Sequence, residues 1–232
     1  MCGRYSIYES MDHYLRQLSL ELVVIDGYDD TRINRYNVAP SSRVQVIRPV
    51  PGGVGVDTVK WGWSPSWARG KRVDPINARV ETLTSNRFFT SLWPAGRALA
   101  PANGWFEWVS DPAQPKRKQA CYISARSGEP LYFAALAQVH DRQAVHAQDG
   151  FVILTAAADE GLVALHERKP VVLTPDLARE WVDAGTTPMR AEEITREGGR
   201  PCADFIWHPV GAAVGNVRNE GAGLIEPMGL VK

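Results

Sequence analysis

The sequence is poor in cysteine. It has only three, Cys2, Cys121 and Cys202, and they lie far apart. An odd number at this spacing excludes a disulfide framework and any CxxC metal or redox motif. The five histidines show no HxxxH or similar spacing of metal ligands. The sequence therefore predicts neither a metal site nor a cofactor.

Long apolar runs are also absent. No stretch reaches the roughly 18 residues that a membrane-spanning helix needs, and the N-terminus lacks the basic-then-apolar pattern of a signal peptide. We therefore expect a cytoplasmic protein without membrane contact. The 232 residues, 44% hydrophobic and 22% charged, suit one globular domain. We expect residues 1–232 to form a single domain, with a flexible tail over the last ~10–20 residues.

Apolar segments at 119–124, 131–139 and 151–157 predict β-strands, and Ser-Gly and Asp-Gly turn signals separate them. Short turns of this kind join antiparallel neighbours. The sequence therefore predicts an α+β fold, a single domain built on a largely antiparallel, barrel-like β-sheet with peripheral helices.

Five segments are typical of helices. Those at 10–20, 174–184 and 187–197 each begin at a serine or threonine that can cap the first turn, and the last two continue with proline, which suits the first helical position. Further helices are expected over 84–92 and over 159–166, where the aspartate at the start is the expected cap.

The formal net charge is zero, which by itself argues against a polyanionic partner, but cations are concentrated in one segment. Between residues 58 and 97 there are seven lysines and arginines against two acidic residues, together with four of the eight tryptophans. Basic residues interleaved with aromatics suit a surface that binds phosphates and stacks on bases. The alternative is that these tryptophans belong to the core, beneath a solvated basic face.

The N-terminal pair Met1-Cys2 has specific chemistry. Initiator methionine is normally removed before a small side chain, which would leave Cys2 first, with its α-amino group and thiol on adjacent carbons. Because an α-amine has a pKa of about 7.7–8.0, a sizeable fraction is neutral at physiological pH and can condense with an aldehyde. The thiol can then close onto the imine carbon to give a thiazolidine. The alternative is an ordinary small residue in a frayed terminus.

Glu107 lies within the aromatic run Gly-Trp-Phe-Glu-Trp at 104–108. A carboxylate there is either exposed on one face of a sheet or buried in a weakly polar pocket. In a pocket near an α-amine it can accept the proton that imine formation must remove.

Seven motifs, in order along nearly the whole chain, resemble the SRAP-domain family of abasic-site processing proteins. They are Met-Cys-Gly-Arg-Tyr at 1–5, Arg-Tyr-Asn-Val-Ala-Pro at 35–40, Trp-Gly-Trp-Ser-Pro-Ser-Trp at 61–67, Ile-Asn-Ala-Arg-Val-Glu-Thr at 76–82, Gly-Trp-Phe-Glu-Trp at 104–108, His-Glu-Arg-Lys-Pro at 166–170, and Trp-His-Pro-Val with Val-Gly-Asn-Val at 207–217. Each motif alone is weak, but seven in register are very specific.

The resemblance implies a function and the residues that perform it. Cys2, freed of Met1, would condense with the open-chain aldehyde of an abasic site, in single-stranded DNA or at a junction with duplex, and close to a covalent thiazolidine crosslink. Asn77 would hydrogen-bond at the crosslink, Glu107 would lie beside the α-amine, and His166 would assist opening of the sugar ring. The implied DNA-binding residues are Arg4, Asn37, Pro40, Trp67, Arg79, Arg87, Thr155 and Arg168.

Within this set, Trp67 would wedge against the DNA and favour single strands or junctions. Ala68 stands where bacterial members of the family can have a second tryptophan. The adjacent Lys71-Arg72 pair could partly replace base stacking by phosphate contact.

Three functions follow from these residues. The leading one is a monomeric enzyme, bound to the nucleoid when on DNA, that shields abasic sites and has a weak lyase side activity, because a Schiff base also permits β-elimination. A cysteine peptidase with Cys2 as nucleophile, assisted by Glu107 and His166, would tolerate an extra N-terminal residue. A plain single-stranded-DNA-binding module would bind reversibly, in a salt-sensitive way that Cys2→Ala leaves intact.

Overall fold

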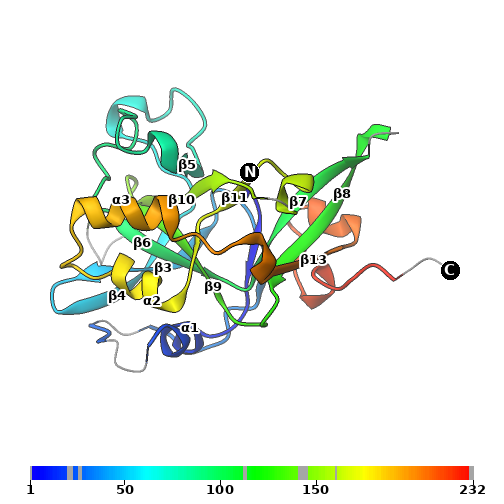
Figure 1. Cartoon of the computed structure of the whole chain (residues 1–232), viewed down its shortest axis with the longest axis horizontal. Coiled ribbons are helices and arrows are strands. Elements are labelled where there is room, and N and C mark those ends of the chain that lie inside the picture. The colour runs from blue at the N-terminus through cyan, green and yellow to red at the C-terminus, as the bar shows by residue number, and fades with distance from the viewer. Residues whose placement is uncertain are drawn as a thin grey trace.

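Two β-sheets with a shared core form the framework of the protein (Figure 1). The computed structural model describes residues 2–19, 23–25, 28–111, 114–140, 146–159 and 161–229, without the side chains of 111 and 114–117. The first sheet has the order β13-β8-β7-β1-β2, formed by Phe205–Pro209, Gln114–Ala125, Gly104–Asp111, Tyr5–Ile7 and Arg35–Val38. All its neighbouring strands are antiparallel.

The second sheet has the order β11-β10-β9-β6-β3-β4. Its neighbouring strands along this path are also antiparallel, and they span Arg168–Pro170, Gly150–Ala157, Leu131–Gln138, Arg97–Ala102, Arg43–Val50 and Gly53–Lys60. Two short strands branch from it: β12 (Val172–Leu173) pairs with β9, and β5 (Asn77–Arg79) pairs in parallel with β10. The predicted strands at 119–124 and 151–157 lie within β8 and β10, and the one at 131–139 covers β9 and extends one residue beyond it.

The core lies between the two sheets. The central strand β9 is apolar along almost its whole length and buried from Leu131 to Ala137, as expected of a strand covered on both faces. Its Phe133 packs edge-on against Tyr5 of β1, with ring centroids 6.0 Å apart, and against Trp105 of β7 at 6.1 Å. The N-terminal strand is therefore fixed to the core directly after Cys2.

The α+β prediction is confirmed, but the barrel-like part of it is not. Within the described residues the strand order of each sheet is open, with β13 and β2 at the ends of one and β11 and β4 at the ends of the other. A single bridge, between Trp61 just after β4 and Phe151, links that end of the second sheet back to β10. A closed barrel would need a continuous ladder of such hydrogen bonds. The same apolar patterns are expected in a closed barrel and in two open sheets, so the sequence could not distinguish these two architectures.

In the part of the chain that the structure describes, three α-helices lie around the second sheet, away from β7, β8 and β13 (Figure 1). They are α1 (Met11–Leu18), α2 (Pro175–Trp181) and α3 (Pro188–Glu197). Each begins after a hydroxyl cap, because the side-chain oxygens of Ser10, Thr174 and Thr187 accept the N–H three residues later. All three predicted caps are confirmed.

The two other expected helices do not form as α-helices. Over 84–92 the chain makes successive turns, in which the Asn86 side chain accepts the N–H of Phe88 at 3.0 Å; such local bonds compete with helical ones. In the described part of 159–166, which leaves out residue 160, the helical structure is limited to the 3₁₀ turn η3 (Leu162–Ala164). Asp159 caps no helix there; its carboxylate accepts the N–H of Cys202 instead.

The C-terminal segment packs on the outer face of the first sheet. Val210, Val214 and Leu224 form a small second core with Phe106 and Tyr122 of β7 and β8. Residues 230–232 of the expected tail lie outside the described residues. Among the helices of the described part, none is both long and apolar enough to cross a membrane.

Candidate active site and nucleic-acid interface

Cys2 lies where the N-terminal segment runs beside β7. Tyr5 pairs in antiparallel register with Trp105, so the residues before Tyr5 run along the next residues of β7. Cys2 is fully buried, and the charge of Glu107 acts on its thiol. The fold therefore brings together two residues that lie more than a hundred positions apart in the sequence.

Asn77 contacts Cys2 from the other sheet. It begins β5, whose parallel pairing with β10 places it beside Ile153. Its Nδ2 donates a hydrogen bond to the carbonyl oxygen of Cys2 at 2.9 Å. Its Oδ1 is buried and has no hydrogen-bond partner among the described residues. Because buried polar atoms are normally paired, this oxygen can accept a hydrogen bond from an N–H group presented near Cys2.

Glu107 is buried, which decides the question that the sequence left open. Along β7, Trp105 and Glu107 share the face that meets the main core, whereas Phe106 and Trp108 face the C-terminal segment. Glu107 is only 4% exposed, and burial raises its pKa to about 7. Near neutral pH both its carboxylate and its carboxylic acid are populated, so it can accept a proton and return one.

The Cys2 thiol differs from a typical nucleophilic cysteine. Burial raises its pKa well above the usual range, and the nearby charge of Glu107 adds to this. The sulfur lies 4.0 Å from the carbonyl oxygen of Arg4. At neutral pH the thiol is therefore protonated, whereas cysteine nucleophiles of hydrolases are activated as thiolates.

His166 follows η3 and is half-buried. Its Nδ1 accepts the backbone N–H of Arg168 at 3.0 Å, and burial lowers its pKa. The imidazole is therefore neutral near pH 7, and its proton lies on Nε2. His166 and Glu107 line the same small crevice, which has no room for a water molecule, together with Trp105, Ile123, Leu162, Leu165, Arg168 and Lys169.

Four of the expected DNA-binding residues are exposed: Pro40, Trp67, Arg79 and Arg87. Trp67 is 54% exposed and packs edge-on against a buried phenylalanine, Phe88. Neither the Arg79 nor the Arg87 guanidinium makes a hydrogen bond or ion pair with the described residues, so both are available to phosphates.

A groove of about 260 Å³ begins at Asn77. Arg72, which the sequence analysis gave only a secondary part, lines it and stacks on Phe88, with its guanidinium carbon 4.0 Å from the ring centre. The groove therefore joins cations and aromatic surface directly to the residue that contacts Cys2. Its lining residues are Arg72, Pro75, Asn77, Arg79, Thr82, Asn86, Phe88 and Phe89.

The other four expected DNA-binding residues make internal contacts. Buried Arg4 donates to Asn37 Oδ1 at 2.7 Å and to the Val214 carbonyl at 2.8 Å, which holds the C-terminal segment. Thr155 is fully buried, and both terminal nitrogens of Arg168 donate to Glu81 at 2.9 Å. A direct contact of these residues with DNA stays a prediction.

In the basic, tryptophan-rich segment at 58–97, some tryptophans belong to the core and another is exposed on the surface. Trp61 and Trp63 are core residues, 0% and 2% exposed, whereas Trp67 is on the surface. Lys60 pairs with Asp74 at 2.7 Å. The exposed part of the segment is thus narrower than the composition suggests.

Lys169 is a site residue that the sequence analysis missed, although it lies within the His-Glu-Arg-Lys-Pro motif. It is 7% exposed, lines the crevice of Glu107 and His166, and pairs with Asp159. Its ammonium also donates to the Arg200 carbonyl at 2.7 Å. The pair ties together the two ends of the segment that carries His166. No spacing signal in the sequence points to it.

Comparison with known proteins shows which family the chain resembles along its length. The family model described as "SOS response associated peptidase (SRAP)" matches residues 1–217. Abasic site processing protein YedK of Escherichia coli is 41% identical over 228 residues, which cover 98% of this chain and all of the relative. Abasic site processing protein HMCES of Gallus gallus is 25% identical over 215 residues, 74% of this chain and 57% of the relative.

Solved structures share the fold. A phage-related protein of Bordetella bronchiseptica superposes with a TM-score of 0.75 and 34% identity, covering 90% of this chain and 94% of that one. A Bacteroides thetaiotaomicron protein, 16% identical, shares the fold with a TM-score of 0.78, over 98% of this chain and all of that one. Together with the family match along nearly the whole sequence, these findings establish that the chain belongs to the SRAP family.

Proposed function

We propose that this protein captures abasic sites in single-stranded DNA as a covalent thiazolidine crosslink to Cys2, after removal of Met1. The observation that carries the proposal is the convergence of Asn77 and Glu107 on Cys2, with His166 in the same crevice as Glu107. Relatives along the whole chain that are named abasic site processing proteins support the substrate.

The reaction needs no cofactor to balance. The neutral α-amine of Cys2 adds to the aldehyde carbon of the open-chain abasic sugar, and the carbinolamine loses one water to give an imine. The S–H group then adds across the C=N bond, so that sulfur bonds to carbon and the proton ends on nitrogen. The product is protein plus DNA minus one water.

Glu107 supplies the proton transfers of the first two steps. With a pKa of about 7, its carboxylate can take a proton from the α-ammonium, and the resulting acid can protonate the departing hydroxyl. General acid–base catalysis is most effective when the pKa lies near the working pH.

His166 has a separate role in opening the sugar. Its Nδ1 accepts the Arg168 N–H, so its Nε2–H is the group that can donate a hydrogen bond to the sugar ring oxygen as the ring opens. Asn77 Oδ1, a buried oxygen without a hydrogen-bond partner in the described part of the chain, then accepts a hydrogen bond from the N–H of the amine or of the finished thiazolidine ring.

The protonated state of the Cys2 thiol favours this reaction over peptidase chemistry. A peptidase needs the thiolate as the first nucleophile, whereas here the amine attacks first and the thiol adds with its proton. The imine stage also allows β-elimination, so a weak lyase activity accompanies trapping when ring closure is slow.

The groove beside Asn77 and the exposed Trp67 suit an unpaired strand. Arg72, Arg79 and Arg87 can contact phosphates, and the Trp67 face can stack on a base. Both features act before the covalent step and do not require a particular sequence.

The proposal is tested by incubating the protein with single-stranded DNA that carries one abasic site, followed by denaturing electrophoresis with and without borohydride. The parent protein should give a crosslink that resists heat without reduction. Cys2→Ser should give one that survives only after reduction of its imine. Adding one residue before Cys2 should abolish trapping, and a protein that still crosslinks through the Cys2 thiol would overturn the mechanism.

A further inference from the structure

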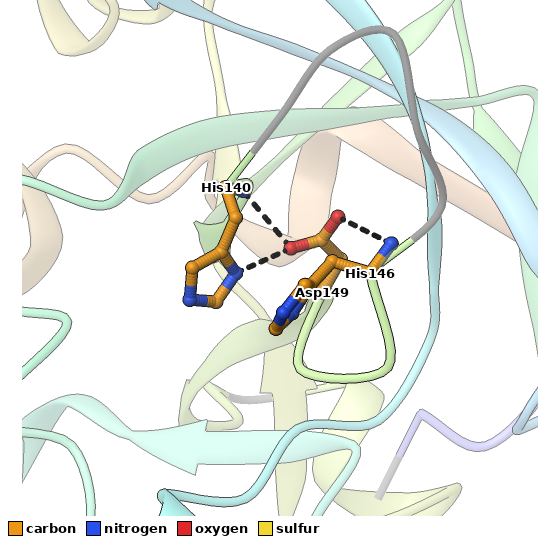
Figure 2. Close-up of side chains that lie close together, drawn as sticks. All are labelled: His140, His146 and Asp149. Atoms are coloured by element: carbon orange, nitrogen blue, oxygen red, sulfur yellow. Dashed lines mark hydrogen bonds and ion pairs between the residues drawn. The ribbon is translucent and has the colours of Figure 1, made fainter.

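Three side chains outside the proposed active site converge where the chain passes from β9 to β10 (Figure 2). His140 follows the end of β9 by two residues, and Asp149 directly precedes β10. Because Gln138 faces Gly150 across the antiparallel pair, the two ends of this connection meet. His146 is brought in by the turn in which the Asp149 N–H donates to its carbonyl at 3.0 Å. None of the three lines the crevice of Glu107 and His166.

Asp149 is the fixed member of the cluster. Its side chain is only 3% exposed, although the residue belongs to the connection that precedes β10. Its Oδ1 accepts the backbone N–H of His140 at 3.0 Å and lies 2.8 Å from Nδ1 of the same histidine. Its Oδ2 accepts the backbone N–H of His146 at 3.4 Å. A buried carboxylate held in this way is preorganised to receive a cation.

The two imidazole rings lie close to each other beside this carboxylate (Figure 2). Their centroids are 4.2 Å apart at an interplanar angle of 39°, and one ligand atom from each of the three residues lies within 4.8 Å of the others. Zn–N and Zn–O bonds of about 2.0–2.2 Å in a tetrahedron place ligand atoms roughly 3.4 Å apart. Both rings are exposed, so small rotations bring their nitrogens to this spacing.

We propose that His140, His146 and Asp149 form a binding site for a divalent transition-metal ion such as Zn²⁺. The ion takes the place of the proton between His140 Nδ1 and Asp149 Oδ1, and the nearby His146 ring supplies the third ligand. Two imidazoles and one carboxylate suit Zn²⁺, Co²⁺ or Ni²⁺, whereas Mg²⁺ and Ca²⁺ prefer oxygen ligands throughout. The fourth position is left for water.

Binding at this site has a structural consequence next to it. A metal ion on His140 Nδ1 leaves that ring's proton on Nε2, which faces the side-chain nitrogen of Gln138 at 2.7 Å. Two donors then oppose each other, so the Gln138 amide must turn. Its oxygen now accepts the indole N–H of the buried Trp63 at 3.0 Å, and that bond is given up. Metal binding should therefore change the NMR signal of the Trp63 indole N–H.

The test uses the full chain after treatment with a chelator. Zn²⁺ binding is measured by calorimetry, Co²⁺ ligation by its visible absorption spectrum, and the Trp63 indole N–H by NMR. The variants are His140→Ala, His146→Ala and Asp149→Asn. His13→Ala, at a histidine of α1, is the matched control, and Cys2→Ala excludes binding at the N-terminal thiol. Thermal unfolding of each variant shows that it is folded.

We expect one ion per chain, an absorption spectrum typical of tetrahedral Co²⁺, and a shift of the Trp63 signal. Either histidine substitution should weaken binding by more than about tenfold, since even the outer partners of metal ligands contribute about 10- to 100-fold. The two control variants should bind as the parent does. The site is refuted if no such ion binds saturably, if the histidine variants retain the parent affinity, or if Cys2→Ala abolishes binding.

Discussion

Replacing Glu107 by glutamine should make the protein more stable and less active, with an effect on stability that depends on pH. The carboxyl is 4% exposed and has a pKa of about 7, against an ordinary value of 4.5. Each pKa unit corresponds to about 1.4 kcal/mol. The folded protein therefore loses about 3 kcal/mol relative to the unfolded chain when this group ionises, and glutamine, which is neutral at every pH, avoids that loss.

The direction in which pH changes the stability difference between the two proteins follows from proton linkage. Because folding raises the pKa of Glu107, the folded state holds its proton more tightly, and this contribution to stability is complete below about pH 4.5 and lost as the pH rises through 7. Glu107→Gln should thus match the parent near pH 4.5 and exceed it by about 3 kcal/mol at pH 8, roughly 6–12 °C in melting temperature for a chain of this size. The crosslinking rate should fall by about 100-fold or more.

The assay is urea unfolding of both proteins across this pH range, beside crosslinking rates on one abasic oligonucleotide. Glu226→Gln, at an exposed position of the C-terminal segment, is the matched control and should change neither quantity by much. A stability gain that does not vary with pH, or a loss of stability at pH 8, would refute the assignment of Glu107 as a buried carboxyl with a raised pKa.

Three further predictions test other parts of the site. His166→Ala should slow crosslinking to a natural abasic site by about 100-fold yet barely affect an oligonucleotide whose aldehyde cannot form a ring; equal losses on both substrates would contradict the ring-opening role. Arg72→Ala should weaken binding of undamaged single strands and reduce the salt slope by about 0.7, whereas Arg218→Ala, on the exposed C-terminal segment, should do so less. Arg4→Met should lower the free energy of unfolding by about 1–2 kcal/mol, because the buried Asn37 Oδ1 loses its donor and the Val214 carbonyl keeps only the bond from Asn37 Nδ2; chemical denaturation measures this.

The local elements of the fold were predictable where a single residue type determines them. Hydroxyl caps at Ser10, Thr174 and Thr187 start the three helices as expected, because the cap bond forms within four residues. The turns around Asn86 were mistaken for a helix, since the side chain's bond to Phe88 N–H competes with helical bonding. Which strands pair with each other could not be predicted from local sequence, because partners such as β5 and β10 lie far apart in the chain.

The sequence motifs identified the residues of the candidate site, but not their surroundings. The burial of Glu107 was not, since it depends on which face of β7 meets the second sheet. Arg4 and Asn37 lie in family motifs, yet their partners are in the C-terminal segment, which no spacing reveals. The cluster of His140, His146 and Asp149 was also missed, because only the meeting of β9 and β10 closes the gap between its members.

Intact-mass measurement shows whether Cys2 joins DNA through both its amine and its thiol. The protein is mixed with a single-stranded oligonucleotide bearing one abasic site and analysed under denaturing conditions without reduction. We expect a species with the mass of the protein lacking Met1 plus the DNA minus one water, absent with Cys2→Ala. Only unmodified protein, with Met1 verified as removed, would contradict it.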